Sequence, residues 1–231
     1  MLTPKENTPQ HTRVSLLLEQ ISADARSTAS WTGRPVFDAA VMSALELVPR
    51  HAFVPDRDKA LAYANRPLSI GHGQTISQPY IVALMTVLLE LEPSHRVLEV
   101  GTGCGYQTAI LAELASQVFT IERIKPLVQK TKELLEGLRY QNIVFKTFDG
   151  TYGWRDQSPF DAILVSAATP SIPTALIEQL ADKGRLVAPV GERDSQDLIV
   201  LNKNGDRMVR RKIGNCKFVP LIGKFAWSEE K

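Results

Sequence analysis

The chain has 231 residues, of which 44% are hydrophobic and 23% charged, and this composition fits one α/β domain with a sizeable core. A formal net charge of +2 is too small to indicate binding to nucleic acid or to a charged membrane surface. Two cysteines and four scattered histidines suggest neither a disulfide framework nor a zinc site, so no bound metal is expected.

The first 13 residues are polar and contain two prolines, and we expect them to be disordered. They lack the basic start and apolar middle of a secretory signal. The longest apolar stretch, residues 81–91, is too short to cross a bilayer. These features predict a cytoplasmic protein without a membrane partner.

Residues 14–60 have a helical pattern with breaks at 33–35 and 48–49. Apolar residues of the first predicted helix recur at helical spacing, at Leu16, Leu17, Ile21 and Ala25. A second predicted helix has its buried stripe at Val36, Ala40, Ala44 and Leu47. Residues 61–78 are rich in Gly, Pro, Asn and Ser and predict an irregular connector. Residues 14–80 are therefore expected to form a helical extension and an active-site connector.

From residue 81 onward, short apolar runs alternate with helical patterns in a way that predicts a cofactor-binding core. Predicted strands cover residues 96–100, 118–121, 143–145, 162–165 and 186–188, with further candidates at 198–201 and 218–221. Predicted helices cover residues 106–115, 126–139 and 173–180. Strands that are apolar on both faces indicate a mainly parallel, doubly wound seven-stranded sheet covered on both sides. Residues 14–231 are expected to form a single domain.

A glycine-rich turn follows the first of these strands and opens a helix, with the sequence Glu99-Val100-Gly101-Thr102-Gly103-Cys104-Gly105. A dinucleotide fingerprint, G-x-G-x-x-G, would need glycine at Tyr106. The spacing G-x-G-x-G with an acidic residue two positions ahead instead resembles the turn of methyltransferases. In that interpretation Glu99 favours the ammonium group of S-adenosylmethionine, and Gly101, Thr102, Gly103 and Gly105 lie along the cofactor. The alternative is a tight strand–helix turn without a ligand.

Two acidic positions extend this candidate cofactor site. Glu122, with Arg123 beside it, follows the next strand about 20 residues after the first glycine, where a carboxylate can accept hydrogen bonds from ribose hydroxyls. Asp149 and Gly150 follow the third strand. They either contact the adenine ring or form a common Asp-Gly turn, and the residues alone leave both readings open.

Residues 71–79, G-H-G-Q-T-I-S-Q-P, carry a resemblance to a known family. Together with residues 97–114, 160–163, 184–187 and 218–223, they resemble the protein-L-isoaspartate (D-aspartate) O-methyltransferase family over residues 36–227. The resemblance implies a class I methyltransferase (Rossmann-like) fold with an N-terminal helical extension.

The resemblance also implies an activity. An enzyme of this family transfers a methyl group from S-adenosylmethionine to the free α-carboxylate of isoaspartyl, and in some cases D-aspartyl, residues in damaged proteins and peptides. S-adenosylhomocysteine is the product, and the ester starts repair through a succinimide. By resemblance Ser77 is the active-site residue, and Gln74, Thr75 and Ile76 line the pocket beside it. His72, Ala168 and Val219 are candidate contacts to the substrate, with a structural role in a turn as the alternative for His72.

Ser77 has a second interpretation, as the N-cap of an apolar helix over residues 80–89. The connector also departs from the family pattern at Asn65 and Ser69. These departures leave open a methyltransferase for a different carboxylate or a dedicated peptide. A non-catalytic sensor of S-adenosylmethionine or damaged protein is the alternative of another class. The favoured interpretation is a monomeric repair enzyme that acts on isoaspartyl proteins.

Overall fold

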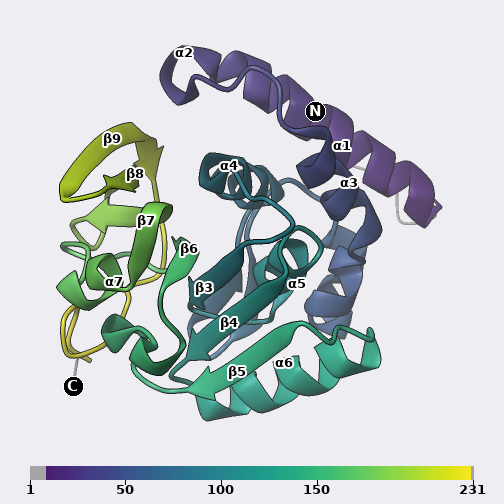
Figure 1. Ribbon diagram of the computed structural model, residues 1–231. Helices are drawn as coiled ribbons and strands as arrows, with labels where there is room; N and C mark the ends of the chain where they lie inside the picture. Colours follow the sequence, from purple (N-terminus) through teal and green to yellow (C-terminus); the bar gives the residue numbers. More distant parts are fainter. Residues whose placement is uncertain (1–8, 230–231) are drawn as a thin grey trace.

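In the computed structural model, which describes residues 9–229, the apolar runs form a seven-stranded sheet (Figure 1). The strands lie in the order β5-β4-β3-β6-β7-β8-β9. Their bounds are β3 (Arg96–Val100), β4 (Gln117–Glu122), β5 (Ile143–Thr147), β6 (Phe160–Val165), β7 (Leu180–Gly191), β8 (Gln196–Asn204) and β9 (Arg207–Cys216). The first five strands of this order are parallel, and β8 and β9 are antiparallel. The predicted mainly parallel seven-stranded sheet is confirmed.

Seven α-helices and four short 3-10 helices are present in residues 9–229. The α-helices are α1 (Gln10–Ser27), α2 (Ala29–Thr32), α3 (Ala39–Leu47), α4 (Pro79–Leu89), α5 (Tyr106–Ala112), α6 (Lys125–Gly137) and α7 (Thr174–Glu178). The 3-10 helices are η1 (Arg50–Phe53), η2 (Asp56–Leu61), η3 (Gly150–Tyr152) and η4 (Arg155–Gln157). Helices α5 and α6 end before residues 115 and 139, where the sequence pattern predicted their ends.

The two faces of the sheet are covered by different layers because successive strand residues point to opposite sides. In β3, Val97 packs into the core beneath α1, α3, α4 and α5, whereas Leu98 and Val100 pack into the core on the α7 side. Helix α4 lies between the sheet and α1, and all its residues except Ile81 are buried. This position explains why residues 81–91 have no polar face. No helix within residues 9–229 is both long and apolar enough to span a bilayer.

The N-terminal extension differs from the sequence expectation in two respects. Helix α1 begins at Gln10, so residues 10–13 belong to a helix rather than to a disordered end, and residues 1–8 lie outside the described residues. Of the stripe predicted for the second helix, now α3, only Ala44 is buried, and Leu47 is 67% exposed. Val36 is 76% exposed and precedes the helix, which begins at Ala39 and buries Val41, Ala44 and Leu45.

The connector and the end of the sheet also differ from the prediction. Residues 61–78 contain an antiparallel hairpin of β1 (Leu68–Gly71) and β2 (Gln74–Ile76) rather than only irregular chain. The seventh strand is β9, and residues 218–221 form no strand but a single parallel bridge between Pro220 and Ala168. The first six residues of β9 are all exposed, so this edge strand lacks the apolar alternation that would reveal it in the sequence.

Candidate active site

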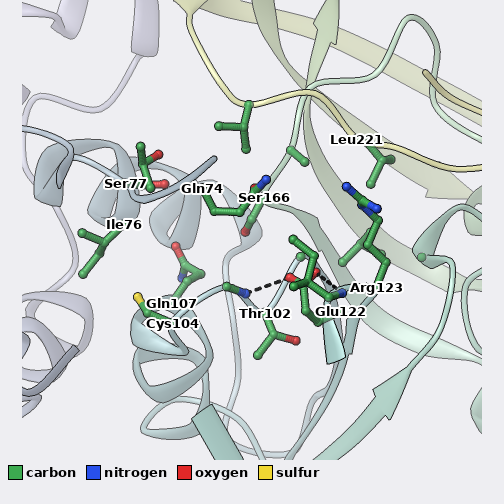
Figure 2. A pocket seen from close by; sticks show the side chains of 18 of the residues that line it. Gln74, Ile76, Ser77, Thr102, Cys104, Gln107, Glu122, Arg123, Ser166 and Leu221 are labelled. Atoms are coloured by element: carbon green, nitrogen blue, oxygen red, sulfur yellow. Dashed lines mark hydrogen bonds between the residues drawn. The ribbon is translucent and has the colours of Figure 1, made fainter. Parts of the chain in front are cut away.

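A cleft opens where the strand order reverses. The chain passes from β3 to β4 and β5 on one side and then crosses to β6 on the other, so the loops after β3 and β6 diverge at the carboxyl ends of the strands. The cleft has about 800 Å³ of space, including its open mouth (Figure 2).

Five segments form most of the wall of the cleft. They are the glycine turn after β3, the residues after β4 and β6, the C-terminal segment 219–222, and the flap, which we define as residues 62–77 and which contains the β1–β2 hairpin. In Figure 2, Gln74, Ile76 and Ser77 of the flap lie on one side of the cleft, and Glu122 and Arg123 lie on the other. A molecule bound there would therefore lie between the flap and the sheet.

The glycine turn has a backbone that other residues adopt only with strain. Gly101, Gly103 and Gly105 have φ angles of +98°, +52° and +86°. Gly101 and Gly103 line the cleft, and the carbonyl of Gly103 accepts a hydrogen bond from Thr131 of α6. Gly105 does not line the cleft, because it packs against Thr131 and Leu135 of α6. Its role is to let α6 approach, so the expectation that it lies along the cofactor is corrected.

Glu99 does not face the cleft either, which corrects its predicted role beside an ammonium group. The side chain is fully buried, and its Oε2 accepts hydrogen bonds from Thr108 (2.6 Å) and Thr120 (2.7 Å). Thr120 in turn contacts the hydroxyl of Thr102, which lines the cleft. Burial raises the pKa of Glu99 to about 8. Glu99 is therefore a neutral carboxyl group near pH 7 and supports the glycine turn through the contact from Thr120 to Thr102.

This burial predicts a pH-dependent gain in stability for Glu99→Gln. Because the folded-state pKa of Glu99 lies above its unfolded value, folding retains a proton between about pH 4 and pH 8, and stability falls as the pH rises through that window. Glutamine removes this loss, so the variant should be more stable than wild type by on the order of 2 kcal/mol at pH 8. Urea unfolding between pH 5.5 and 9 measures the difference. Parallel pH profiles for the variant, the wild type and the exposed control Glu133→Gln would contradict the assignment.

Glu122 is placed as the sequence predicts, at the end of β4 on the wall of the cleft. Its Oε2 accepts the N–H of Gly103 (3.1 Å) and its Oε1 accepts the N–H of Ile124 (2.9 Å), as Figure 2 shows. Each carboxylate oxygen keeps further acceptor capacity. The carboxylate is thus fixed by two backbone groups and can still accept hydrogen bonds from a diol. Beside it, Arg123 lines the cleft and pairs with Glu229.

Ser77 lies at the end of the flap and lines the cleft together with Gln74, Thr75 and Ile76. Its hydroxyl makes no hydrogen bond to any residue between 9 and 229. The N-cap of α4 is Gln78 and has no side-chain cap, so the alternative role of Ser77 as a helix cap is wrong. The side chain of Asn65 serves the helix end instead, because its Oδ1 accepts the N–H of Tyr80 (2.9 Å). The Ser77 hydroxyl is therefore free to bind a ligand.

Three other predicted residues lie outside the wall of the cleft. His72 is exposed at the tip of the hairpin with a φ of +54°. The carboxylate of Asp149 accepts hydrogen bonds from Thr151 and from the N–H of Lys224, so it forms a turn and holds the C-terminal segment. Ala168 is buried and its backbone pairs with Val219 and Leu221. Gly150 and Val219, in contrast, line the cleft as predicted.

Sequence reasoning missed several residues of the cleft. Ser166 follows β6 at the strand end, a position that the topology could have indicated. Gln107 lines the cleft from α5 and donates a hydrogen bond to Thr86 of α4 (2.9 Å). Other unpredicted wall residues are Val82, Val100, Cys104, Tyr106, Ile121, Ile124, Ala167, Pro220, Leu221 and Ile222. Most of these are apolar residues whose positions depend on tertiary packing.

Comparison with known proteins agrees with this geometry. The family model described as protein-L-isoaspartate (D-aspartate) O-methyltransferase matches residues 32–226. The chain belongs to this family. The matched region includes the flap, the glycine turn, Glu122 and the C-terminal segment, so the whole wall of the cleft lies within the family's common sequence.

Relatives within the family are similar along most of their length. Protein-L-isoaspartate O-methyltransferase 1 of Syntrophobacter fumaroxidans is 48% identical over 90% of this chain and 97% of the relative. Protein-L-isoaspartate O-methyltransferase 2 of a Polaromonas species is 51% identical over 90% of this chain and all of the relative. A Plasmodium falciparum protein described as a beta-aspartate methyltransferase was solved in complex with S-adenosyl-L-homocysteine. Its structure matches this chain with a TM-score of 0.77 at 24% identity, and the match covers 93% of this chain and 99% of the P. falciparum chain. This likeness supports the class I methyltransferase fold.

Proposed function

We propose that this protein is a protein-L-isoaspartate O-methyltransferase that uses S-adenosylmethionine to methylate the free α-carboxylate of isoaspartyl residues. The supporting observation is the free hydroxyl of Ser77, which lies on the wall of a cleft at the switch point of a class I methyltransferase sheet. Family membership, with relatives near 50% identity, supports the same substrate class.

The cleft fits the cofactor on its own geometry. Gly101 and Gly103 line the cleft and carry no side chain, so a ligand can approach their backbone closely. Glu122 presents two fixed acceptors for the ribose hydroxyls. When bound, S-adenosylmethionine supplies a methyl group on a positively charged sulfur that is already a good leaving group. These residues would hold its sugar and amino-acid parts along the ends of β3 and β4.

The remaining chemistry requires orientation rather than proton transfer. An isoaspartyl α-carboxylate is ionised at neutral pH, so the chain needs no general base to activate it. The Ser77 hydroxyl can donate a hydrogen bond to one carboxylate oxygen and leave the other free to approach the methyl carbon. The flap and residues 219–222 border the cleft, and with a peptide bound they would shield the reacting groups from water.

A pair of peptides that differ only in their Asp or isoAsp linkage tests the proposal. Purified protein is incubated with labelled S-adenosylmethionine, and base-labile methyl ester is counted on each peptide. We expect ester on the isoAsp peptide alone. Absence of ester on both peptides, despite measurable binding of S-adenosylhomocysteine, would reject the repair function and favour another acceptor or a sensor.

The departure from the family pattern at Asn65 has a structural explanation. Asn65 donates to the Asp24 carboxylate through Nδ2 (2.6 Å) and accepts from the Tyr80 N–H through Oδ1, so it connects α1 to the start of α4. Ser69 is exposed, and its hydroxyl accepts from the Gly71 N–H. Neither residue lines the cleft, so neither favours a different acceptor.

The predicted role of Glu122 can be tested by binding alone. Glu122→Gln replaces one carboxylate oxygen with an amide donor, which would face a backbone N–H and could no longer accept from ribose. We expect the Kd for S-adenosylhomocysteine to rise at least ~10-fold, because a hydrogen bond to a charged group contributes about 1.5 kcal/mol or more. Isothermal titration calorimetry measures it, with Glu133→Gln as the control. Equal Kd values for the two variants would exclude a ribose-binding role.

We also propose that the enzyme works as a monomer in the cytoplasm. The two cysteines are free thiols, which is compatible with a reducing compartment. Sedimentation analysis tests the oligomeric state.

A further inference from the structure

Arg50 is a fully buried cation that has no carboxylate partner within residues 9–229. It is the first residue of η1, and none of its surface is accessible to solvent. Burying a charge without an opposite charge is costly, so the contacts that it makes must stabilise it in other ways. Burial lowers the pKa of Arg50, although a guanidinium group stays protonated under all ordinary conditions.

The guanidinium group joins the two ends of the flap. Its Nε donates to the carbonyl of Ala62 (2.9 Å), the first residue of the flap, and its Nη2 donates to the carbonyl of Ser77 (2.7 Å), the last. The group also lies 4.7 Å from the ring centroid of Tyr106, which lines the cleft. One side chain therefore fixes both ends of the flap against α5.

Other contacts also hold the flap: Asn65 bonds to Asp24 and to the Tyr80 N–H, and Leu68 and Ile76 are buried in the core. Arg50 differs from these contacts because, within residues 9–229, it alone bonds to the backbone at both Ala62 and Ser77. The hairpin pairs only three residues of each strand, and a hairpin of this size is marginally stable by itself. Hydrogen bonds from a charged donor are about twice as strong as neutral ones. The planar fork of arginine reaches two carbonyls at once, which the single ammonium of lysine does less well. Nη1 has no hydrogen-bond partner, so the two carbonyl bonds and the Tyr106 ring set the orientation of the group.

We infer that Arg50 is a positioning residue for methyl transfer: by holding the Ala62 and Ser77 carbonyls, it closes the base of the flap and fixes the Ser77 hydroxyl at the cleft. The inference rests on the proposed function of Ser77. Arg50 itself does not line the cleft. Its effect on the reaction therefore acts through Ser77, and this distinguishes it from a residue that only stabilises the fold.

A double-mutant cycle tests the inference. Arg50→Lys should lower kcat on the isoAsp peptide about 10-fold while the Kd for S-adenosylhomocysteine changes less than about threefold. In a Ser77→Ala background the same change should lower kcat by less than about twofold, because the group that it positions is absent. The control Arg57→Lys alters a side chain that is 74% exposed, and it should have no effect in either background. Two results would overturn the inference. One is an unchanged kcat for Arg50→Lys, and the other is a kcat for the double variant that equals the product of the two single reductions.

Hydrogen exchange gives a second readout that needs no acceptor. In wild type the amides of residues 68–77 should exchange as one cooperative unit. In Arg50→Lys the same amides should exchange at least ~10-fold faster, while the amides of β3 and β4 stay protected. If Arg50→Lys does not fold, the exchange rates of the wild-type flap still test the inference. Amides of residues 68–77 that exchange at unrelated rates would contradict a flap held at both ends by Arg50. Failure of the proposed function is distinguishable, since then wild type forms no ester although the exchange pattern is as expected.

Discussion

Ser77→Ala is expected to lower kcat for ester formation on an isoAsp peptide by about 10–100-fold, since a hydrogen bond to a charged group contributes about 1.5–3 kcal/mol. The hydroxyl lies on the wall of the cleft and has no other hydrogen-bond partner in the described part of the chain. Removal of the hydroxyl should therefore affect the orientation of the acceptor carboxylate, and it should leave cofactor binding and stability nearly unchanged. Initial rates with labelled S-adenosylmethionine, measured at saturating peptide, give kcat directly.

The matched control is Ser69→Ala. Ser69 belongs to the same flap, but it is exposed and lies outside the wall of the cleft. Both variants should bind S-adenosylhomocysteine with similar Kd values and unfold at similar urea concentrations. If the two serine variants retain the same kcat, or if Ser77→Ala loses activity only through weaker cofactor binding, Ser77 does not orient the acceptor.

Gly105→Ala is expected to have the largest effect on stability, a loss of about 3 kcal/mol or more from backbone strain and overpacking. The φ angle of +86° is strained for alanine, and its Cβ would lie 2.4 Å from Thr131 Cγ2 and 3.0 Å from Leu135 Cδ1. Thr131 cannot move without loss of its hydrogen bond to the Gly103 carbonyl (2.8 Å). The glycine turn and α6 would therefore separate, and urea unfolding with and without S-adenosylhomocysteine measures both stability and binding.

Gly137→Ala provides the comparison within the same packing layer. Gly137 is the last residue of α6, and a Cβ there meets no atom within 4 Å. Alanine favours a helix over glycine by up to about 1 kcal/mol, so this variant should be as stable as wild type or more stable. Similar unfolding midpoints for Gly105→Ala and Gly137→Ala would contradict the prediction, because the glycine turn would then tolerate a larger distance to α6 without loss of stability.

Features that depend on local sequence were predicted correctly. The parallel strands are continuous apolar runs, and the positions of Gly101, Gly103 and Glu122 follow from the strand–turn–helix order. The predicted roles of Glu99 and Asp149 fail for a different reason. Each is an acidic residue near a strand end, but its direction is set by distant partners. These are the buried hydroxyls of Thr108 and Thr120 for Glu99 and the exposed backbone N–H of Lys224 for Asp149.

Features that depend on contacts between distant segments could not be predicted. Arg50 lies 27 residues before Ser77, whose carbonyl it binds, and nothing in the neighbouring sequence indicates that its guanidinium group is buried. The edge strand β9 is recognisable only through its pairing with β8, since its exposed residues are mostly cationic. Residues 218–221 look like a strand because they are apolar, and they are apolar because Val219 and Leu221 border the cleft.

The dependence of the cleft on residues 219–222 has a consequence for truncated chains. The five parallel strands end at Gly191, whereas one border of the cleft is formed only by residues that follow the sheet. The segment is held by the Ala168 backbone and by the carboxylate of Asp149. A chain cut before Val219 would therefore keep the residues of all five parallel strands but lack this border of the cleft, and limited proteolysis near the C-terminal segment should remove activity before it unfolds the sheet.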